Sequence, residues 1–138
     1  QMWLITGITE DEIDYLWDTL EPLVKSALEN GGSLEESSSI RGAILDRTMQ
    51  AWGILRGDQI TGVGITTVEE WDKGRCLTVV ALSGVDMVEW LPEFERTVRV
   101  FAVANGCKFV GLEGRRGWVR ELQRFGWKDV SVKMYKGL

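Results

Sequence analysis

The sequence predicts a mixed α/β domain in which a long helix joins two parallel strands of an otherwise antiparallel sheet. Residues 49–82 contain three runs rich in Val, Ile, Thr and aromatic residues, which favour strands. Apolar residues then recur at helical spacing over Met87–Ala102, and a further β-rich run follows at Lys108–Leu112. Because a helix that connects two strands of one sheet makes a right-handed crossover, the two strands are expected to be parallel.

The first long helix begins with a start signal. Thr9 and Glu12 have the spacing of a capping box, in which each side chain bonds to the other residue's backbone N–H group. Pro22 lies inside the helical pattern and predicts a kink or break just before it. After a Ser-rich loop, a weaker helical pattern covers Ile40–Thr48. The apolar stripe that predicts the long helix consists of Ile13, Leu16, Trp17, Leu20, Leu23, Val24, Ala27 and Leu28.

The three β-rich runs predict an antiparallel meander of Met49–Arg56, Gln59–Val68 and Cys76–Leu82. The next helix covers Met87 to Asn105, although Pro92 is most favourable in a first turn and so favours a start after Met87. The stripes of the two long helices predict that the following side chains are buried: Trp17, Leu20, Phe94, Val98 and Phe101.

The C-terminal part predicts three short elements. Lys108–Leu112 is expected to be a strand, Arg116–Arg124 a helix that ends before Gly126, and Asp129–Lys136 a final strand with alternating apolar residues. The sequence contains no repeat or linker, so residues 1–138 are expected to form a single domain.

Composition excludes several classes of function. The net charge of −5 argues against nucleic-acid binding, which needs clustered Lys and Arg. The absence of His removes the commonest general base and zinc ligand, and no metal site is predicted. Two cysteines outside any CxxC pair indicate a reducing, cytoplasmic location. Gln1–Ile8 is too short and polar for a secretion signal, and no membrane-spanning segment is expected.

The order of elements, and above all the C-terminal pattern, resembles the GNAT (N-acetyltransferase) superfamily. Lys108–Glu113 resembles the fifth strand of that family, and Phe125–Val130 resembles its closing Gly-Phe turn, with Trp127 in place of Phe. The resemblance covers almost the whole chain and implies a mostly antiparallel sheet with splayed parallel central strands, flanked by helices. Glu113–Trp118 also resembles small GNAT-like proteins encoded by tailed bacteriophages.

The resemblance implies that acetyl-CoA lies where the fourth and fifth strands splay, and that its acetyl group passes to a small-molecule or protein amine. Only Gly84 remains of the glycines in the family's phosphate-binding loop, and Asp86 adds a negative charge there. Two interpretations stay open: an ordinary strand-to-helix turn with Asp86 as N-cap, or a working phosphate loop. The cofactor-binding residues that the resemblance implies on the fourth strand are Val80, Ala81, Leu82, Ser83 and Gly84.

The family's general-acid Tyr falls on Leu122, so that group is absent. The candidate bases are Glu113, at the end of the expected fifth strand, and Glu70, in the expected loop after the third strand together with Glu69. A carboxylate can deprotonate an amine if burial raises its pKa. The alternative for each is an exposed, solvated charge.

A basic segment contains Arg115 and Arg116 at the start of the last helix, with Trp118 and Trp127 nearby. It can be a solvated helix face, a site for CoA phosphates, or a site for single-stranded nucleic acid, and the overall acidity argues against the third. Seven Trp residues also favour a protein partner bound through an exposed Trp. The alternative function is therefore a catalytically inactive GNAT-fold binding or structural protein, such as a phage accessory protein or virion component.

Overall fold

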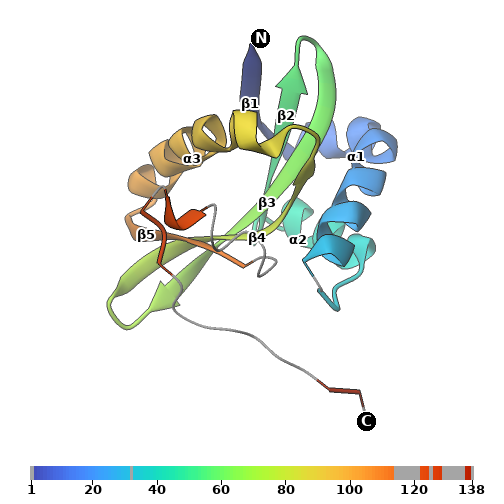
Figure 1. Cartoon of the computed structure of the whole chain (residues 1–138). Helices are drawn as coiled ribbons and strands as arrows, with labels where there is room; N and C mark the ends of the chain where they lie inside the picture. The colour runs from blue at the N-terminus through green and yellow to red at the C-terminus, as the bar shows by residue number, and fades with distance from the viewer. Residues whose placement is uncertain (1, 32, 114–121, 125, 129–135, 138) are drawn as a thin grey trace.

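The computed structural model describes residues 2–31, 33–113, 122–124, 126–128 and 136–137 (Figure 1). No helix in this described part of the chain is both long enough and apolar enough to cross a bilayer. The expected final strand lies almost wholly outside the described residues, as does most of the expected last helix. The elements in chain order are β1 (Trp3–Ile8), α1 (Glu10–Asn30), α2 (Ser37–Leu45), β2 (Gln50–Arg56), β3 (Gln59–Trp71), β4 (Gly74–Gly84), α3 (Met87–Ala104) and β5 (Cys107–Leu112).

The strands form one five-stranded sheet in the order β1-β2-β3-β4-β5. The first four strands are antiparallel neighbours, and β5 is parallel to β4 with α3 connecting them. This confirms the predicted strand, helix and parallel strand over Cys76–Leu112. The meander has one strand more than expected, because Trp3–Ile8 pairs with β2. Only Ile5 of these six residues is buried, so the edge strand lacks the alternation that predicts strands.

Helices cover both faces of the sheet: α1 and α2 pack on one face and α3 on the other (Figure 1). Four of the five side chains expected in the core are buried: Trp17, Leu20, Phe94 and Val98 are 7%, 1%, 2% and 0% exposed. The fifth, Phe101, is only partly buried and meets the ring of Trp52 edge-on, with 5.5 Å between the ring centroids.

The capping box at the start of α1 is confirmed. The Thr9 N–H donates to Oε1 of Glu12 at 2.9 Å, and the Glu12 N–H donates to Oγ1 of Thr9 at 3.3 Å. Of the kink or break expected just before Pro22, the break is wrong, because α1 continues through this residue to Asn30. Leu20 and Val24 are each 1% exposed on the two sides of Pro22, so packing against the sheet holds both halves in one helix.

The later start expected for α3 is also wrong, because the helix begins at Met87 and contains Pro92. Trp90 supplies the reason. Its side chain is fully buried, and its Nε1–H donates to the carbonyl oxygen of Val85 at 2.7 Å. Burial of the indole therefore fixes the first turn of α3 at this position.

Candidate functional site

Strands β4 and β5 separate before β4 ends. Their register pairs run only as far as Val79 and Leu112, and the Glu113 N–H donates to the Val79 carbonyl at 2.9 Å. On its other side β4 pairs with β3 as far as Gly84. Within the described part of the chain, no strand lies against the β5-facing edge of Val80–Gly84. We call this opening the β4–β5 wedge, and such an edge can bind an extended ligand through backbone hydrogen bonds.

A β-bulge marks the point where the wedge opens. Two consecutive residues of β3 pair with Ala81 and Val79, so Val80 is an extra residue in β4. Val80 and Ala81 both pack toward α1, whereas Val79 and Leu82 belong to the cluster under α3. The bulge therefore interrupts the alternation of side chains and the backbone ladder at this point.

The last residues of β4 are fixed by packing. The Ser83 hydroxyl is buried and donates to the Leu23 carbonyl of α1 at 2.7 Å. Gly84 has a φ of 146°, and a Cβ there would lie 3.1 Å from the indole of Trp90. The Ser83 side chain therefore anchors β4 to α1. Any contact of Ser83 or Gly84 with a ligand at this edge would be made by backbone groups.

Asp86 lies at the N-cap of α3, but its backbone is left-handed (φ 57°, ψ 36°) and its side chain makes no capping hydrogen bond. Its Oδ2 lies 3.4 Å from Nη1 of Arg56, and the Arg56 guanidinium stands 5.5 Å from the ring centroid of Trp3. Both partners of this ion pair are about two-fifths exposed, so the pair contributes at most about 1 kcal/mol. The start of α3 therefore carries a carboxylate that Arg56 partly neutralises.

The structure does not bring Glu70 to the wedge. The loop expected to hold Glu69 and Glu70 is wrong, because both residues lie on β3, which extends to Trp71. Glu70 pairs with Arg75, with 2.6 Å between Oε1 and Nε. From Arg75 to Val80, five residues of strand span roughly 16 Å. Glu70 therefore lies at the far end of β4 from the wedge.

Glu113 lies at the apex of the wedge, where its N–H bonds to Val79. Its side chain is exposed and has an interaction of its own. Arg115 and Arg116, which the sequence offered for phosphate binding, lie outside the described residues. Of the predicted site residues, the structure thus groups Glu113 with the end of β4.

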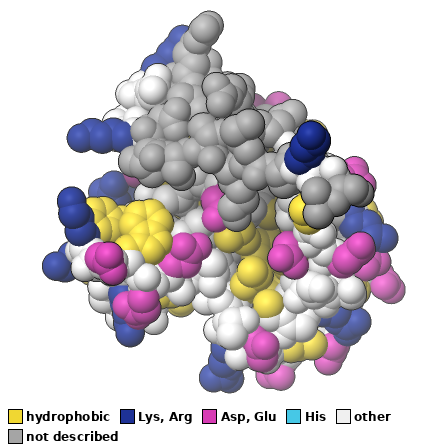
Figure 2. Space-filling view, turned by 90° about the horizontal axis from the view of Figure 1, so that it is seen from below, with side chains coloured by type: hydrophobic (Ala, Val, Ile, Leu, Met, Phe, Trp, Pro, Cys, Tyr) yellow, Lys and Arg dark blue, Asp and Glu magenta, His cyan; other side chains and the backbone are white. Residues whose placement is uncertain are grey.

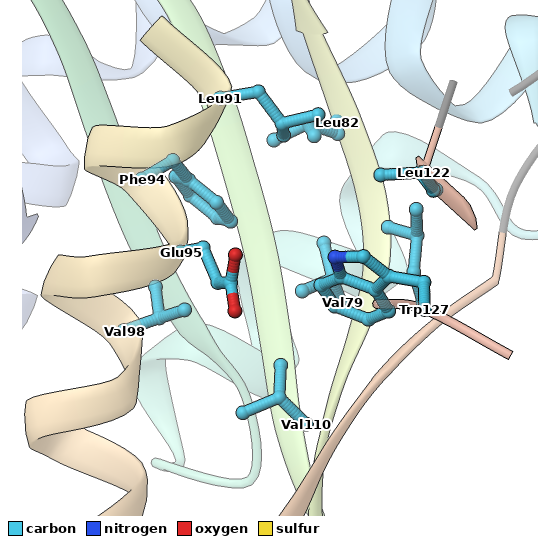
Figure 3. Close-up of a pocket in the computed structure, with 10 residues that line it drawn as sticks. Val79, Leu82, Leu91, Phe94, Glu95, Val98, Val110, Leu122 and Trp127 are labelled. Carbon is cyan, nitrogen blue, oxygen red and sulfur yellow. The ribbon is translucent and has the colours of Figure 1, made fainter. Parts of the chain in front are cut away.

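An apolar pocket lies beside the wedge, between α3 and the β4–β5 pair (Figure 3). Its cavity volume is only about 10 Å³, which is room for about one water molecule. Leu122, which stands at the Tyr position of the GNAT resemblance, lines it and is 7% exposed. The ten lining residues are Val79, Leu82, Leu91, Phe94, Glu95, Val98, Val110, Leu112, Leu122 and Trp127.

Glu95 is the charged member of this lining. Figure 3 shows its carboxylate extending from α3 toward the strands, with Val79 and Trp127 on the opposite side. The side chain is 27% exposed, and its Oε1 accepts a hydrogen bond from Nη2 of Arg99 at 3.1 Å. Sequence reasoning missed Glu95, although it interrupts the apolar stripe one residue after Phe94.

The two cysteines are poor nucleophiles. Burial raises the pKa of the Cys76 thiol above its ordinary value, and burial likewise raises the pKa of Cys107. Both groups are therefore thiols at neutral pH, and the thiolate is the reactive form. Covalent catalysis by either of these cysteines is therefore disfavoured.

Figure 2 shows one face of the molecule, on which acidic and basic side chains are interspersed. Nucleic-acid binding needs a continuous basic surface, and this face offers none among its described residues. Trp71 and Phe109 stack with their ring centroids 6.1 Å apart and are 42% and 41% exposed. Of the described tryptophans, Trp71 is the one that fits the predicted protein contact through an exposed Trp.

No protein-family model matches the chain, and no curated protein matches its sequence. Solved structures match it closely. The aminoglycoside acetyltransferase meta-AAC0020 from an uncultured soil metagenomic sample, in complex with sisomicin, has a TM-score of 0.70 at 14% identity, over 99% of this chain and 96% of that one. A GNAT family acetyltransferase from Staphylococcus aureus has a TM-score of 0.65 at 9% identity, over 100% of both chains. This chain has the GNAT fold.

A third GNAT-fold neighbour is a predicted acetyltransferase with acetyl-CoA from Clostridium acetobutylicum. Its TM-score is 0.68 at 11% identity, over 99% of this chain and 96% of that one. These likenesses confirm the fold class that the order of elements predicted. At such low identity they describe the backbone and not the side chains. The chemistry of the GNAT fold in this chain therefore has to be argued from its own wedge and pocket.

Proposed function

We propose that this protein transfers the acetyl group of acetyl-CoA to an amine. The observation that carries the proposal is the β4–β5 wedge, which opens at the Val80 bulge in a chain with the GNAT fold. The edge of Val80–Gly84 offers backbone groups to the amide-bearing arm of CoA, as an added strand would use them. The neighbour that contains acetyl-CoA and the neighbour that contains the amine sisomicin support this substrate pair. A CoA thioester as donor is also consistent with a cytoplasmic location.

The reaction is a direct attack. The amine nitrogen forms a bond to the carbonyl carbon of the thioester, the carbon–sulfur bond breaks, and CoA leaves as thiolate. The proton lost by the amine passes to a base, and the thiolate takes up a proton to become the thiol. We assign the base to Glu113, because it lies at the wedge apex. We assign no role to Glu70, which pairs with Arg75 at the other end of β4.

One observation favours a non-catalytic GNAT-fold protein instead. Asp86 places a carboxylate at the start of α3, where a pyrophosphate would otherwise meet the positive end of the helix dipole. In that case the protein would act by binding a partner, with the aromatic pair of Trp71 and Phe109 as the contact, as a phage accessory or virion component would. Acetyl-CoA affinity separates the two candidates.

Arg115 and Arg116 are proposed to hold the CoA phosphates in place of the missing loop glycines. Replacing either by Ala should weaken acetyl-CoA binding about tenfold, since each loses a charge-assisted hydrogen bond worth roughly 1.5 kcal/mol. Asp86→Asn should tighten binding, because it removes a negative charge while the side chain caps no backbone group. Calorimetric titration of the four proteins with acetyl-CoA measures these changes. Micromolar wild-type affinity that neither arginine affects would contradict the phosphate role, and no binding at millimolar acetyl-CoA would favour the non-catalytic protein.

A further inference from the structure

The outer edge of β1 is open to a further strand. β1 is the end strand of the sheet and pairs with β2 along its whole length, from Trp3 to Ile8 (Figure 1). No other strand of the described chain pairs with it. Because alternate residues of an antiparallel strand direct their backbone N–H and carbonyl groups to opposite edges, half of these groups in β1 point away from β2. They can bind another strand through backbone hydrogen bonds.

This edge lacks the features that keep sheet edges from pairing. Such features are charged side chains, prolines and β-bulges. Met2–Thr9 contains no charged residue and no proline, and the register of β1 against β2 has no bulge. Two apolar side chains along it, Met2 and Leu4, are 84% and 54% exposed. A strand that pairs here would cover the free backbone groups and part of these side chains.

Charge indicates which strand fits this edge. The side chains of β1 are apolar or carry a hydroxyl group, so a charged partner strand would lose hydration without gaining an ion pair. The partner strand is therefore uncharged. β1 of a second copy meets this condition, although the chain as a whole carries a net charge of −5. An edge without charge is also where two acidic chains can approach with the least repulsion.

The order of residues in β1 also fits a second copy. Trp3 and Gly7 lie two residues before and two residues after Ile5. In an antiparallel pair centred on Ile5, Trp3 of each copy is therefore opposite Gly7 of the other, so the indole lies over a residue without a side chain. In the same register Leu4 is opposite Thr6, and this pair also places no charge in the contact.

We propose that two copies of this chain pair through β1, antiparallel and centred on Ile5, to form one continuous sheet. The two-fold axis stands perpendicular to the sheet, so each face of one copy continues into the same face of the other. α3, which packs on β1, then covers the same face of the joined sheet in both copies. The inference concerns assembly and does not depend on acetyl transfer.

The competing surface for a second copy is the exposed pair of Trp71 and Phe109. Trp71 is followed directly by the charged residues Asp72 and Lys73, which an interface there would have to pair or desolvate. The edge of β1 carries no such cost. A substitution on one surface that leaves the other unchanged separates the two.

The test is sedimentation equilibrium of the full chain without a tag, which measures the mass and the dissociation constant of the dimer. At about 10 μM we expect the mass of two chains. Thr6→Lys places a charge on the edge and should weaken the dimer at least about tenfold. The Thr6 side chain is exposed and bonds to the neighbouring Gly7 carbonyl at 3.5 Å, so the variant should keep its circular dichroism spectrum. Trp71→Ala is the control on the competing surface and should dimerise like the wild type.

A mixture of two variants tests the register. Leu4→Glu should weaken the dimer as Thr6→Lys does, because each puts a charge opposite an uncharged residue. In a heterodimer of the two variants, the new carboxylate at position 4 is opposite the new ammonium group at position 6, and the other Leu4–Thr6 pair is unchanged. The mixture should therefore dimerise at least about tenfold more tightly than either variant alone.

A monomer at about 100 μM would overturn the inference, and so would a dimer that Thr6→Lys leaves intact. A dimer that Trp71→Ala weakens as much as Thr6→Lys does would assign the contact to the aromatic pair instead. If the mixture binds no more tightly than its components, the two strands do not pair about Ile5 and the inference is wrong. Acetyl-CoA is absent throughout, so none of these results bears on the proposed function.

Discussion

Replacing Phe94 by Ala is expected to lower the free energy of unfolding by about 3–5 kcal/mol, the usual cost of a large cavity in a core. The ring is 2% exposed and meets that of Trp90 edge-on at 6.2 Å between centroids. It also lies directly over Gly64, where an added Cβ would come within 2.5 Å of it. Because the backbone of β3 and the Trp90 ring hold the walls of the site, little relaxation can fill the space. Chemical denaturation followed by circular dichroism measures the change.

The control for Phe94 is Val100→Ala on the same helix. Val100 is 69% exposed, so this substitution should change stability by no more than about 0.5 kcal/mol. Similar denaturation midpoints for the two variants would show that α3 does not pack on the sheet through Phe94, and would contradict the core described above.

Replacing Trp90 by Ala is expected to cost a similar amount, about 3–5 kcal/mol, and also to weaken acetyl-CoA binding. The indole is fully buried, and its hydrogen bond to Val85 fixes the turn between β4 and α3. Loss of that bond should loosen the turn that follows Val80–Gly84, the edge at which the arm of CoA is proposed to bind. Denaturation and acetyl-CoA calorimetry measure the two effects separately.

Trp90→Phe separates the hydrogen bond of Trp90 from its bulk. It keeps most of the ring but leaves the Val85 carbonyl without this donor, at a cost of about 1–3 kcal/mol. Trp71→Ala, at a residue 42% exposed, is the control and should leave acetyl-CoA affinity unchanged. If Trp90→Ala unfolds as readily as expected but binds acetyl-CoA like the wild type, the turn has no part in the site.

Local pattern was enough to predict most of the fold. The capping box of α1, the β-rich runs and the stripe of α3 depend on neighbours in the sequence, so they could be recognised without tertiary information. The strand β1 could not, because it buries Ile5 alone and becomes a strand only by pairing with β2. Pro22 was misleading for the converse reason, since packing on both sides of it outweighs its local preference.

Less of the candidate site than of the fold could be predicted from the sequence. The position of the wedge follows from the order of elements, but the Val80 bulge arises from the register of β3 against β4, which no single strand reveals. Glu70 was expected in a loop because β3 was expected to end at Val68; its pairing with Arg75 instead extends the β3–β4 hairpin away from the wedge. The sequence shows Glu95 as a carboxylate within the apolar stripe of α3. That Glu95 lines a pocket could not be predicted, because residues of other elements form the rest of the lining.

The most direct test of the proposed acetyl transfer is the rate at which free CoA thiol appears when the protein meets acetyl-CoA and a primary amine. With 2-phenylethylamine or butylamine, we predict amine-dependent thiol release that falls about a hundredfold or more in Glu113→Gln, as expected for loss of a general base. Glu70→Gln, at the far end of β4, should leave the rate unchanged. Thiol release no faster with amine than without it, in a protein that binds acetyl-CoA, would contradict acetyl transfer to an amine of this class.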